Sequence, residues 1–258
     1  MKKKSYVGVT GFMTHQEVVN TLKDIDFQKT EKLLMIGVLA SLKSIQGITN
    51  KWPQRYPLIG EIRKIFPTNQ NCLNLIHFNT SEPENLLSQM LYLTDIAGEQ
   101  LNGFQLNLTW PSAKTVERYK RIHNGKSIVL QIGSRAFEEV SHSPQKLADR
   151  VHNEYEGLID YVLLDPSGGT GAPFNPRITR GYLEALSTQK NDFGLGIAGG
   201  LSPSTLDLIE PFIKDFPELS IDAEGKLRTP EDNLSVSITR DYIQKSLELF
   251  SEPLYFRV

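Results

Sequence analysis

The chain has 258 residues, of which 39% are hydrophobic and 22% are charged, and its formal net charge is −2. This composition is typical of a globular protein with a sizeable core, and the nearly balanced charge argues against a nucleic-acid-binding surface. No segment approaches the roughly 18 apolar residues of a membrane span, so we expect a protein that binds neither nucleic acid nor membranes.

Eight short apolar segments, rich in β-branched and aromatic residues, recur along the chain and predict β-strands. In chain order they are YVGV at 6, KLLMIGVLA at 32, CLNLIHF at 72, GFQLNL at 103, SIVLQIG at 127, YVLLD at 161, FGLGIA at 193 and LSIDA at 219. They recur roughly every thirty residues, which leaves room for a helix between one strand and the next.

Helical periodicity appears between the predicted strands, as in the segments 83–98, 144–158 and 203–216. Several helices are expected to begin at a polar capping residue followed by proline, a common helix-start signal. These pairs are Ser143–Pro144, Asn175–Pro176 and Ser202–Pro203. The widest interval between predicted strands, 42–71, is expected to form a long loop that covers one end of the fold.

The alternation of strands and helices indicates parallel strands joined by right-handed crossovers. An open, doubly wound sheet would use the same alternation, but eight units that fill about 250 residues favour a closed (β/α)8 barrel. No linker-like or low-complexity segment divides the chain. The predicted fold is therefore α/β, a single TIM-barrel domain spanning residues 1–258.

Function in such a barrel is expected at the carboxyl ends of the strands, where loops from several strands meet. The sixth predicted strand ends at Asp165 and runs into a glycine-rich turn, and glycine-bearing loops also follow the seventh and eighth strands. Glycine can adopt positive φ and expose backbone N–H groups to an anion, although glycines can also serve only to make tight turns. The expected phosphate-binding residues are Gly168, Gly169, Thr170, Gly171, Gly199, Gly200, Asp222 and Gly225.

Two of these loops carry a family resemblance. GGTGAPFNP at 168 and GIAGGLSPSTL at 196 closely resemble the phosphoribosylanthranilate isomerase family of tryptophan biosynthesis. Weaker similarity to the same family extends along most of the chain, at GVTGFMTHQEV (8), PQRYP (53), LIHFNTSEPENLL (75) and FQLNL (104). The resemblance implies the same barrel fold and an isomerase acting on a phosphorylated sugar.

The family reaction is an Amadori rearrangement of a phosphoribosyl amine. A general acid protonates the ring oxygen, the sugar opens to an imine, and a general base removes the proton at C2. The resemblance makes Asp165 the general acid, and it places Thr10 where the family has its catalytic cysteine base. The two expected catalytic positions are therefore Asp165 and Thr10.

An aliphatic hydroxyl such as that of Thr10 ionises too weakly to act alone as a base at neutral pH. Another side chain must then remove the proton, or the reaction differs from that of the family. His15, His77 and Asp222 are the candidates. Cys72, the single cysteine, begins the third predicted strand at the opposite end of the barrel, so we expect it to be an inert, buried thiol.

Four residues are expected to bind the substrate. Arg55 lies where the family has an arginine that holds the carboxylate of anthranilate, and Asn107 replaces a histidine of the family's fourth strand. Arg135 follows the fifth strand, and His77 lies on the third. Both arginines could instead be solvated surface residues. Glu224, after the eighth strand, would repel a phosphate unless its side chain turns away.

Three functions remain open after the sequence analysis: an enzyme that isomerises a phosphorylated, sugar-type small molecule with an altered base, the family isomerase itself with a substituted base, and a barrel that binds the phosphorylated ligand without catalysis. Neither a metal nor an organic cofactor is expected, because no ligand cluster appears at a recognisable spacing. One unpaired cysteine fits a reducing, cytoplasmic setting. We expect a monomer or a homodimer.

Overall fold

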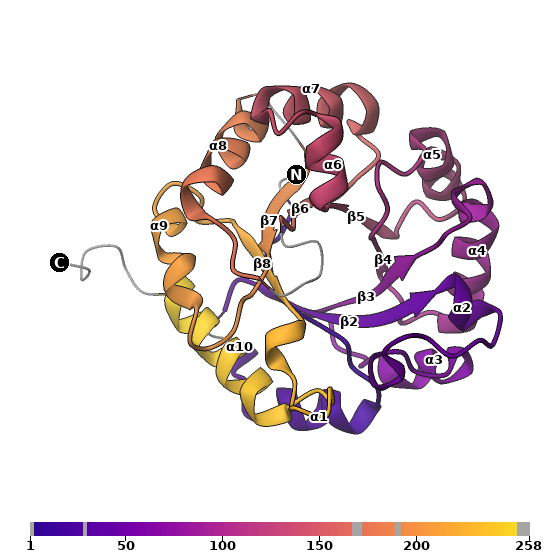
Figure 1. Cartoon of the computed structure of the whole chain (residues 1–258). Helices are drawn as coiled ribbons and strands as arrows, with labels where there is room; N and C mark the ends of the chain where they lie inside the picture. Colours follow the sequence, from indigo (N-terminus) through magenta and orange to yellow (C-terminus); the bar gives the residue numbers. More distant parts are fainter. Residues whose placement is uncertain (1–2, 28–29, 167–171, 189–191, 252–258) are drawn as a thin grey trace.

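The computed structural model describes residues 3–27, 30–166, 172–188 and 192–251. Eight strands form a closed barrel in the order β1 to β8, and every neighbouring pair is parallel, including β1 with β8. Helices surround the strands in an outer ring (Figure 1). The predicted (β/α)8 TIM barrel is confirmed.

Each strand begins within one residue of its predicted start. The strands are β1 (Tyr6–Thr10), β2 (Leu33–Ser41), β3 (Cys72–Asn79), β4 (Gly103–Leu106), β5 (Ser127–Ile132), β6 (Tyr161–Leu164), β7 (Gly194–Ala198) and β8 (Ser220–Ala223). Almost all their residues are buried, because one face of each strand lines the barrel interior and the other packs against the helices.

The helices lie between consecutive strands, and α10 follows β8. They are α1 (His15–Leu22), α2 (Leu42–Ile45), α3 (Ile62–Ile65), α4 (Leu86–Ala97), α5 (Ala113–Ile122), α6 (Ser134–Glu139), α7 (Pro144–Tyr155), α8 (Pro176–Ser187), α9 (Glu210–Ile213) and α10 (Val236–Ser251). Short 3-10 turns are η2 (Pro53–Arg55), η3 (Ile59–Glu61), η4 (Pro83–Asn85), η5 (Leu206–Leu208) and η6 (Gly225–Leu227). None of the helices in these described ranges is long and apolar enough to cross a membrane.

Two of the three predicted capping residues start helices. The side chain of Ser143 accepts a hydrogen bond from the first turn of α7, and Asn175 does the same for α8. The helix predicted over 203–216 is instead divided into η5 and α9. The Thr205 hydroxyl donates a hydrogen bond to the Gly200 carbonyl, which holds residues 200–205 in a turn. Pro211 lacks the backbone N–H that a continuous helix would need at this position.

The barrel interior divides into an apolar half and a polar half. The apolar half contains Tyr6, Met35, Leu73, Leu75, Val129, Tyr161, Leu163 and Ala198. The rings of Tyr6 and Tyr161 meet edge to face near the amino ends of the strands, with centroids 5.1 Å apart. Nearer the carboxyl ends lie the buried polar side chains of Thr10, His77, Gln105, Gln131 and Asp222, so the apolar layer forms the base on which the candidate site lies.

The segment between β2 and β3 contains α2, η2, η3 and α3 in place of one long helix. Arg55 of η2 forms hydrogen bonds with Glu224 and Asp232, which follow β8. The segment therefore covers part of the carboxyl end of the barrel, as the sequence predicted for one end of the fold.

Candidate active site at the carboxyl end of the barrel

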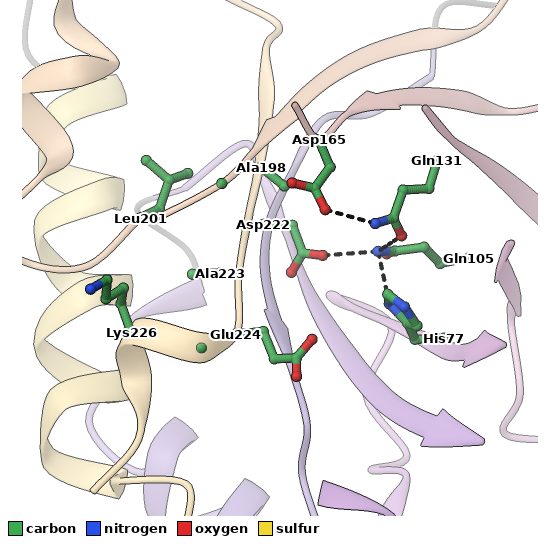
Figure 2. A pocket seen from close by; sticks show the side chains of 13 residues that line it. His77, Gln105, Gln131, Asp165, Ala198, Leu201, Asp222, Ala223, Glu224 and Lys226 are labelled. Atoms are coloured by element: carbon green, nitrogen blue, oxygen red, sulfur yellow. Dashed lines mark hydrogen bonds between the residues drawn. The ribbon is translucent and has the colours of Figure 1, made fainter. Parts of the chain in front are cut away.

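A chain of hydrogen bonds crosses the barrel interior and joins two buried carboxylates (Figure 2). Gln131 Nε2 donates to Asp165 Oδ2 at 2.9 Å, and Gln131 Oε1 accepts from Gln105 Nε2 at 3.1 Å. Gln105 Nε2 also donates to Asp222 Oδ2 at 3.1 Å. On the other side, the Thr10 hydroxyl donates to both oxygens of Asp222 at 3.2 Å. Residues from β1, β4, β5 and β8, together with Asp165 directly after β6, thus form one connected network.

His77 forms a branch of this network. Its Nδ1 lies 3.1 Å from Gln105 Nε2, and its Nε2 lies 3.1 Å from Asn107 Nδ2. Burial lowers the pKa of His77, although the charges of Glu224 and Asp165 oppose the shift. A neutral imidazole donates at one nitrogen and accepts at the other, so one neighbouring amide must present its oxygen. Asn107 suits that role, because Gln105 Nε2 already donates to two oxygens.

Asp222 is the carboxylate with the most altered acidity in this network. Its pKa rises to about 7, mainly because burial removes water from the charged form, while Glu224 and Asp165 add repulsion. Hydrogen bonds from Gln105 and Thr10 limit the rise. A carboxyl group with a pKa near neutrality can both accept and release a proton, which is the property required of a general base.

Thr10 occupies the last position of β1, and its hydroxyl contacts Asp222 because Gly37 on β2 leaves room beside it. A Cβ atom at Gly37 would lie 2.5 Å from Thr10 Oγ1. The structure therefore places Thr10 against Asp222, the carboxyl group whose pKa burial raises to about 7, in a position to orient that carboxylate.

Two of the three expected phosphate-binding turns, those after β7 and β8, line the same pocket as the carboxylates. Gly199, Gly200 and Gly225 all line it, and the two residues after β7 adopt positive φ of 113° and 66°. A Cβ atom at Gly200 would lie 2.7 Å from the backbone nitrogen of Pro173, so this turn packs directly against the loop that returns from β6. Gly168, Gly169, Thr170 and Gly171, predicted to bind phosphate in that loop, lie outside the described residues.

The charges around the pocket differ from those expected. Glu224 lines the pocket, but its carboxylate accepts a hydrogen bond from Arg55 Nη1 at 2.9 Å, which offsets the negative charge that would repel a phosphate. Lys226, which the sequence analysis did not select, also lines the pocket and is exposed. The sequence feature that could have indicated Lys226 is its place next to Gly225, in the glycine-bearing loop after the eighth strand.

Arg55 is engaged within the protein. Its Nε and Nη2 donate to Asp232 at 2.7 to 3.0 Å and its Nη1 donates to Glu224, and these bonds raise the pKa of the guanidinium. Arg135 lies outside this pocket, with a side chain that is 79% exposed and a 3.9 Å contact to Glu139. Neither arginine contacts the two buried aspartates.

His15, a candidate base, and Cys72, expected to be inert, both lie away from the network. His15, at the start of α1, contacts the carbonyl oxygen of Ile65 at 3.3 Å and does not line the pocket. Cys72 begins β3 at the amino end of the barrel, where burial raises the pKa of its thiol to about 12. This thiol is not a source of the missing base. In the described part of the chain, no group of three or more His, Cys, Asp or Glu residues is placed to hold a metal ion.

Gln105 and Gln131 were not selected from the sequence, although they form the centre of the network. Each is an inward-facing polar residue in an otherwise apolar strand, and each is nearly fully buried. A polar side chain at such a position must find a hydrogen-bonding partner, so it signals a buried network. The sequence does not indicate which partner it finds.

The closed parallel barrel, with a polar network at the carboxyl ends of its strands, is an enzyme-type TIM barrel. A phosphoribosylanthranilate isomerase from Thermus thermophilus has a similar structure, with a TM-score of 0.65 and 15% identity over 95% of this chain and 99% of that one. A structure of a phosphoribosylanthranilate isomerase in complex with reduced 1-(o-carboxyphenylamino)-1-deoxyribulose 5-phosphate matches with a TM-score of 0.61 and 16% identity over 93% of this chain and 97% of that one.

The comparison extends to other barrels. A Rubisco-like protein from Rhodopseudomonas palustris matches with a TM-score of 0.58 and 6% identity over 97% of this chain and 65% of that one. No protein-family model and no curated protein sequence matches the chain. At these identities the likeness establishes the fold. The resemblance to phosphoribosylanthranilate isomerase predicted from the glycine loops is therefore confirmed as a structural resemblance.

Proposed function

We propose that the protein is an acid–base isomerase of a phosphorylated, sugar-derived small molecule. The observation that carries the proposal is the pair of buried carboxylates, Asp165 and Asp222, joined through two glutamines beside a glycine turn. Isomerisation of a sugar requires one group that donates a proton and another that removes one. Two carboxyl groups with different surroundings can divide these roles.

In the proposed mechanism, for a substrate that carries an amine at C1, Asp165 donates a proton to the ring oxygen while the bond between that oxygen and C1 breaks; the amine nitrogen supplies the electrons, which leaves an iminium group at C1. Asp222 removes the proton from C2, and the electrons of that bond form the C1–C2 double bond of an enaminol. Protonation at C1 and loss of the hydroxyl proton at C2 then give the ketone. Thr10 orients Asp222 through its hydrogen bond and does not itself remove a proton.

The phosphate is proposed to bind at the turns after β6, β7 and β8, next to Gly199, Gly200 and Gly225. Positive φ at the β7 turn directs backbone amides differently from an ordinary strand end, as in anion-binding nests. Lys226 adds a positive charge at this edge, and Arg55 offsets the negative charge of Glu224. The ligand in one solved structural neighbour, a deoxyribulose 5-phosphate derivative, supports this class of substrate.

The proposal predicts that the protein exchanges the C2 proton of its substrate with solvent. Sugar phosphates and phosphoribosylanthranilate would be incubated with the full chain in D2O, and loss of the C2 proton signal followed by NMR. Asp165→Asn and Asp222→Asn should each lower the exchange rate by a factor on the order of 100 or more, because each removes a proton-transfer group. Asp95→Asn, at an exposed site on α4, is the matched control.

The alternative function is a barrel that binds the phosphorylated ligand without catalysis, and the hydroxyl of Thr10 in place of an ionisable group favours it. Binding of ribulose 5-phosphate by calorimetry, with no exchange or conversion of any compound in the panel, would establish this alternative and contradict the isomerase proposal. Conversion of phosphoribosylanthranilate by the wild-type chain would identify the family reaction. Conversion of phosphoribosylanthranilate by the Thr10→Cys variant but not by the wild-type chain would show that only the catalytic base of the family had been lost.

A further inference from the structure

A second cavity lies beside the aspartate network, over the carboxyl ends of β3, β4 and β5. Its volume is about 520 Å³, whereas the pocket between Asp165 and Asp222 measures about 50 Å³, which is room for only a few water molecules. Gln131 lines both spaces, and His77 of the first contacts Asn107 of the second. A substrate that reaches both aspartates must therefore place most of its bulk in the larger space, which we call the β3–β5 cleft.

Uncharged polar side chains dominate the lining of this cleft. They are Asn79, Thr80, Ser81, Asn107, Thr109 and Gln131. Hydroxyl and amide groups both donate and accept hydrogen bonds, so they match a ligand that carries neutral groups of the same kinds. Arg135 and Glu139 also line the cleft, but they face each other at 3.9 Å and together add no net charge.

The loop that forms one wall of the cleft is held in a strained conformation. Trp110 follows Thr109 and has a φ of 48°, a value that a bulky side chain rarely adopts. Stacking on Tyr155, with ring centroids 6.3 Å apart, and contact with Arg150, whose guanidinium lies 4.2 Å from the indole centroid, hold it there. Such strain persists only where surrounding contacts enforce it. Here it sets the position of Thr109 at the cleft.

Arg55, the arginine expected to hold a substrate carboxylate, is already paired with carboxylates of the protein. Arg55 donates through Nε and Nη2 to Asp232 and through Nη1 to Glu224. A ligand carboxylate at this position would have to displace two carboxylates of the protein. The β3–β5 cleft instead offers exposed neutral hydroxyls, those of Ser81 and Thr109, which a ligand can reach.

We propose that the β3–β5 cleft binds the part of the substrate that does not carry the phosphate, and that this part bears uncharged hydroxyl or amide groups instead of an aromatic carboxylate. The inference rests on the proposed function and adds the substrate class to it. It separates this protein's specificity from that of the solved neighbour whose ligand carries a carboxyphenyl group.

Two ligands that differ only in one group test the proposal: reduced 1-(o-carboxyphenylamino)-1-deoxyribulose 5-phosphate and its carboxamide counterpart. Calorimetry on the full chain should show that the carboxamide binds at least about tenfold more tightly, because a carboxylate in a neutral cleft loses water without gaining a partner. Ser81→Trp, which fills the cleft, should weaken the carboxamide about tenfold more than it weakens ribulose 5-phosphate. Ser88→Trp, an equal change at an exposed site on α4, should alter neither affinity.

Three outcomes would overturn the inference. Equal or tighter binding of the carboxylate ligand, with loss of that affinity in Arg135→Gln or Arg55→Gln, would show that the second group is anionic. Unchanged binding of the carboxamide in Ser81→Trp would place that group outside the cleft. Failure of ribulose 5-phosphate to bind the wild-type chain would instead contradict the proposed phosphate site, and with it the function on which the inference rests.

Discussion

Asp222 combines burial, two hydrogen-bond donors and two like charges around one carboxyl group. Burial opposes ionisation, and the charges of Glu224 and Asp165 add to that effect. Gln105 and Thr10 donate to the carboxylate and favour its charged form. Because the first group of effects is larger, the pKa rises to about 7 and the side chain can change charge near neutral pH.

The raised pKa of Asp222 predicts how stability and activity depend on pH. The folded state holds this proton up to about pH 7, whereas the unfolded chain releases it near the ordinary value of 3.8. The contribution to stability is therefore fully present below about pH 4 and is lost as pH rises through 7, by a few kcal/mol at most. Urea unfolding at pH 5 and pH 8 should show wild type losing stability relative to Asp222→Asn over this interval.

The same titration sets the activity expected of Asp222 as a base. The C2 exchange rate should rise with pH through about 7, because only the ionised carboxylate accepts a proton. A rate that stays constant from pH 6 to pH 8, together with equal pH dependence of stability in wild type and Asp222→Asn, would contradict the assigned role.

At the scale of elements, the site depends on how the loops after neighbouring strands meet. The turn after β7 approaches the backbone of Pro173, and Gly200 is the residue that permits both its positive φ and this close approach. Asn175, two residues after Pro173, then caps α8. The turn after β7 and residues 172–175 are therefore packed against each other, although α8 and β7 lie between them in the sequence.

Gly200→Ala tests this packing. The added Cβ would lie 2.7 Å from Pro173 N at an unfavourable φ, so we expect a loss of about 1–3 kcal/mol in the free energy of unfolding, together with weaker binding of ribulose 5-phosphate. Urea unfolding and calorimetry measure the two effects. Gly60→Ala is the control, because a Cβ atom there meets nothing within 4 Å. Equal stability of the two variants would show that the loops do not depend on close contact.

At the scale of the whole molecule, the barrel separates its structural end from its candidate functional end. Near the amino ends of β1, β2 and β8, Lys32 is buried, and its ammonium donates to Ser5 and to the Leu219 carbonyl at 2.9 Å and lies 3.7 Å from the Phe250 ring centroid. These contacts join the first, second and last strands with α10. They lie at the end opposite the aspartate network.

Because Lys32 lies at the end of the barrel opposite the aspartate network, we expect Lys32→Met to change the stability of the protein but not its catalysis. Burial lowers its pKa from 10.5 to about 8, although Glu218 opposes the shift, so the contribution to stability is present above pH 10.5 and is lost as pH falls through 8. Relative to Lys32→Met, wild type should gain stability between pH 7.5 and pH 10, as measured by urea unfolding. The C2 exchange rate of Lys32→Met at pH 7.5 should match that of wild type.

Lys114→Met, at an exposed position on α5, provides the matched control. It should show no comparable difference from wild type over the same pH interval. A slower C2 exchange in Lys32→Met, with folding intact, would show that the two ends of the barrel are not independent.

Much of the architecture could be predicted from local patterns in the chain. The starts of all eight strands follow from short apolar segments and their regular spacing, and Ser143 and Asn175 mark helix starts because a cap depends on residues within one turn. The helix predicted at 203–216 was wrong in length, since the backbone there follows the Thr205 bond to Gly200 and the proline at 211. Asp165 and the glycine turns were also visible, because they stand directly after apolar segments that predict strands, and the carboxyl ends of barrel strands carry the site.

The connections that make a candidate site out of these residues depend on contacts between distant parts of the chain. Thr10 and Asp222 are 212 positions apart and meet only because the barrel closes between β1 and β8. Gln105 and Gln131 join the two aspartates through hydrogen bonds. Arg55 forms its hydrogen bonds with Glu224 and Asp232. No local sequence pattern encodes these pairings. Residue types and their periodicity specify the strands and where chemistry can occur, whereas burial and charge, which set each group's acidity and availability, arise only when those strands pack together.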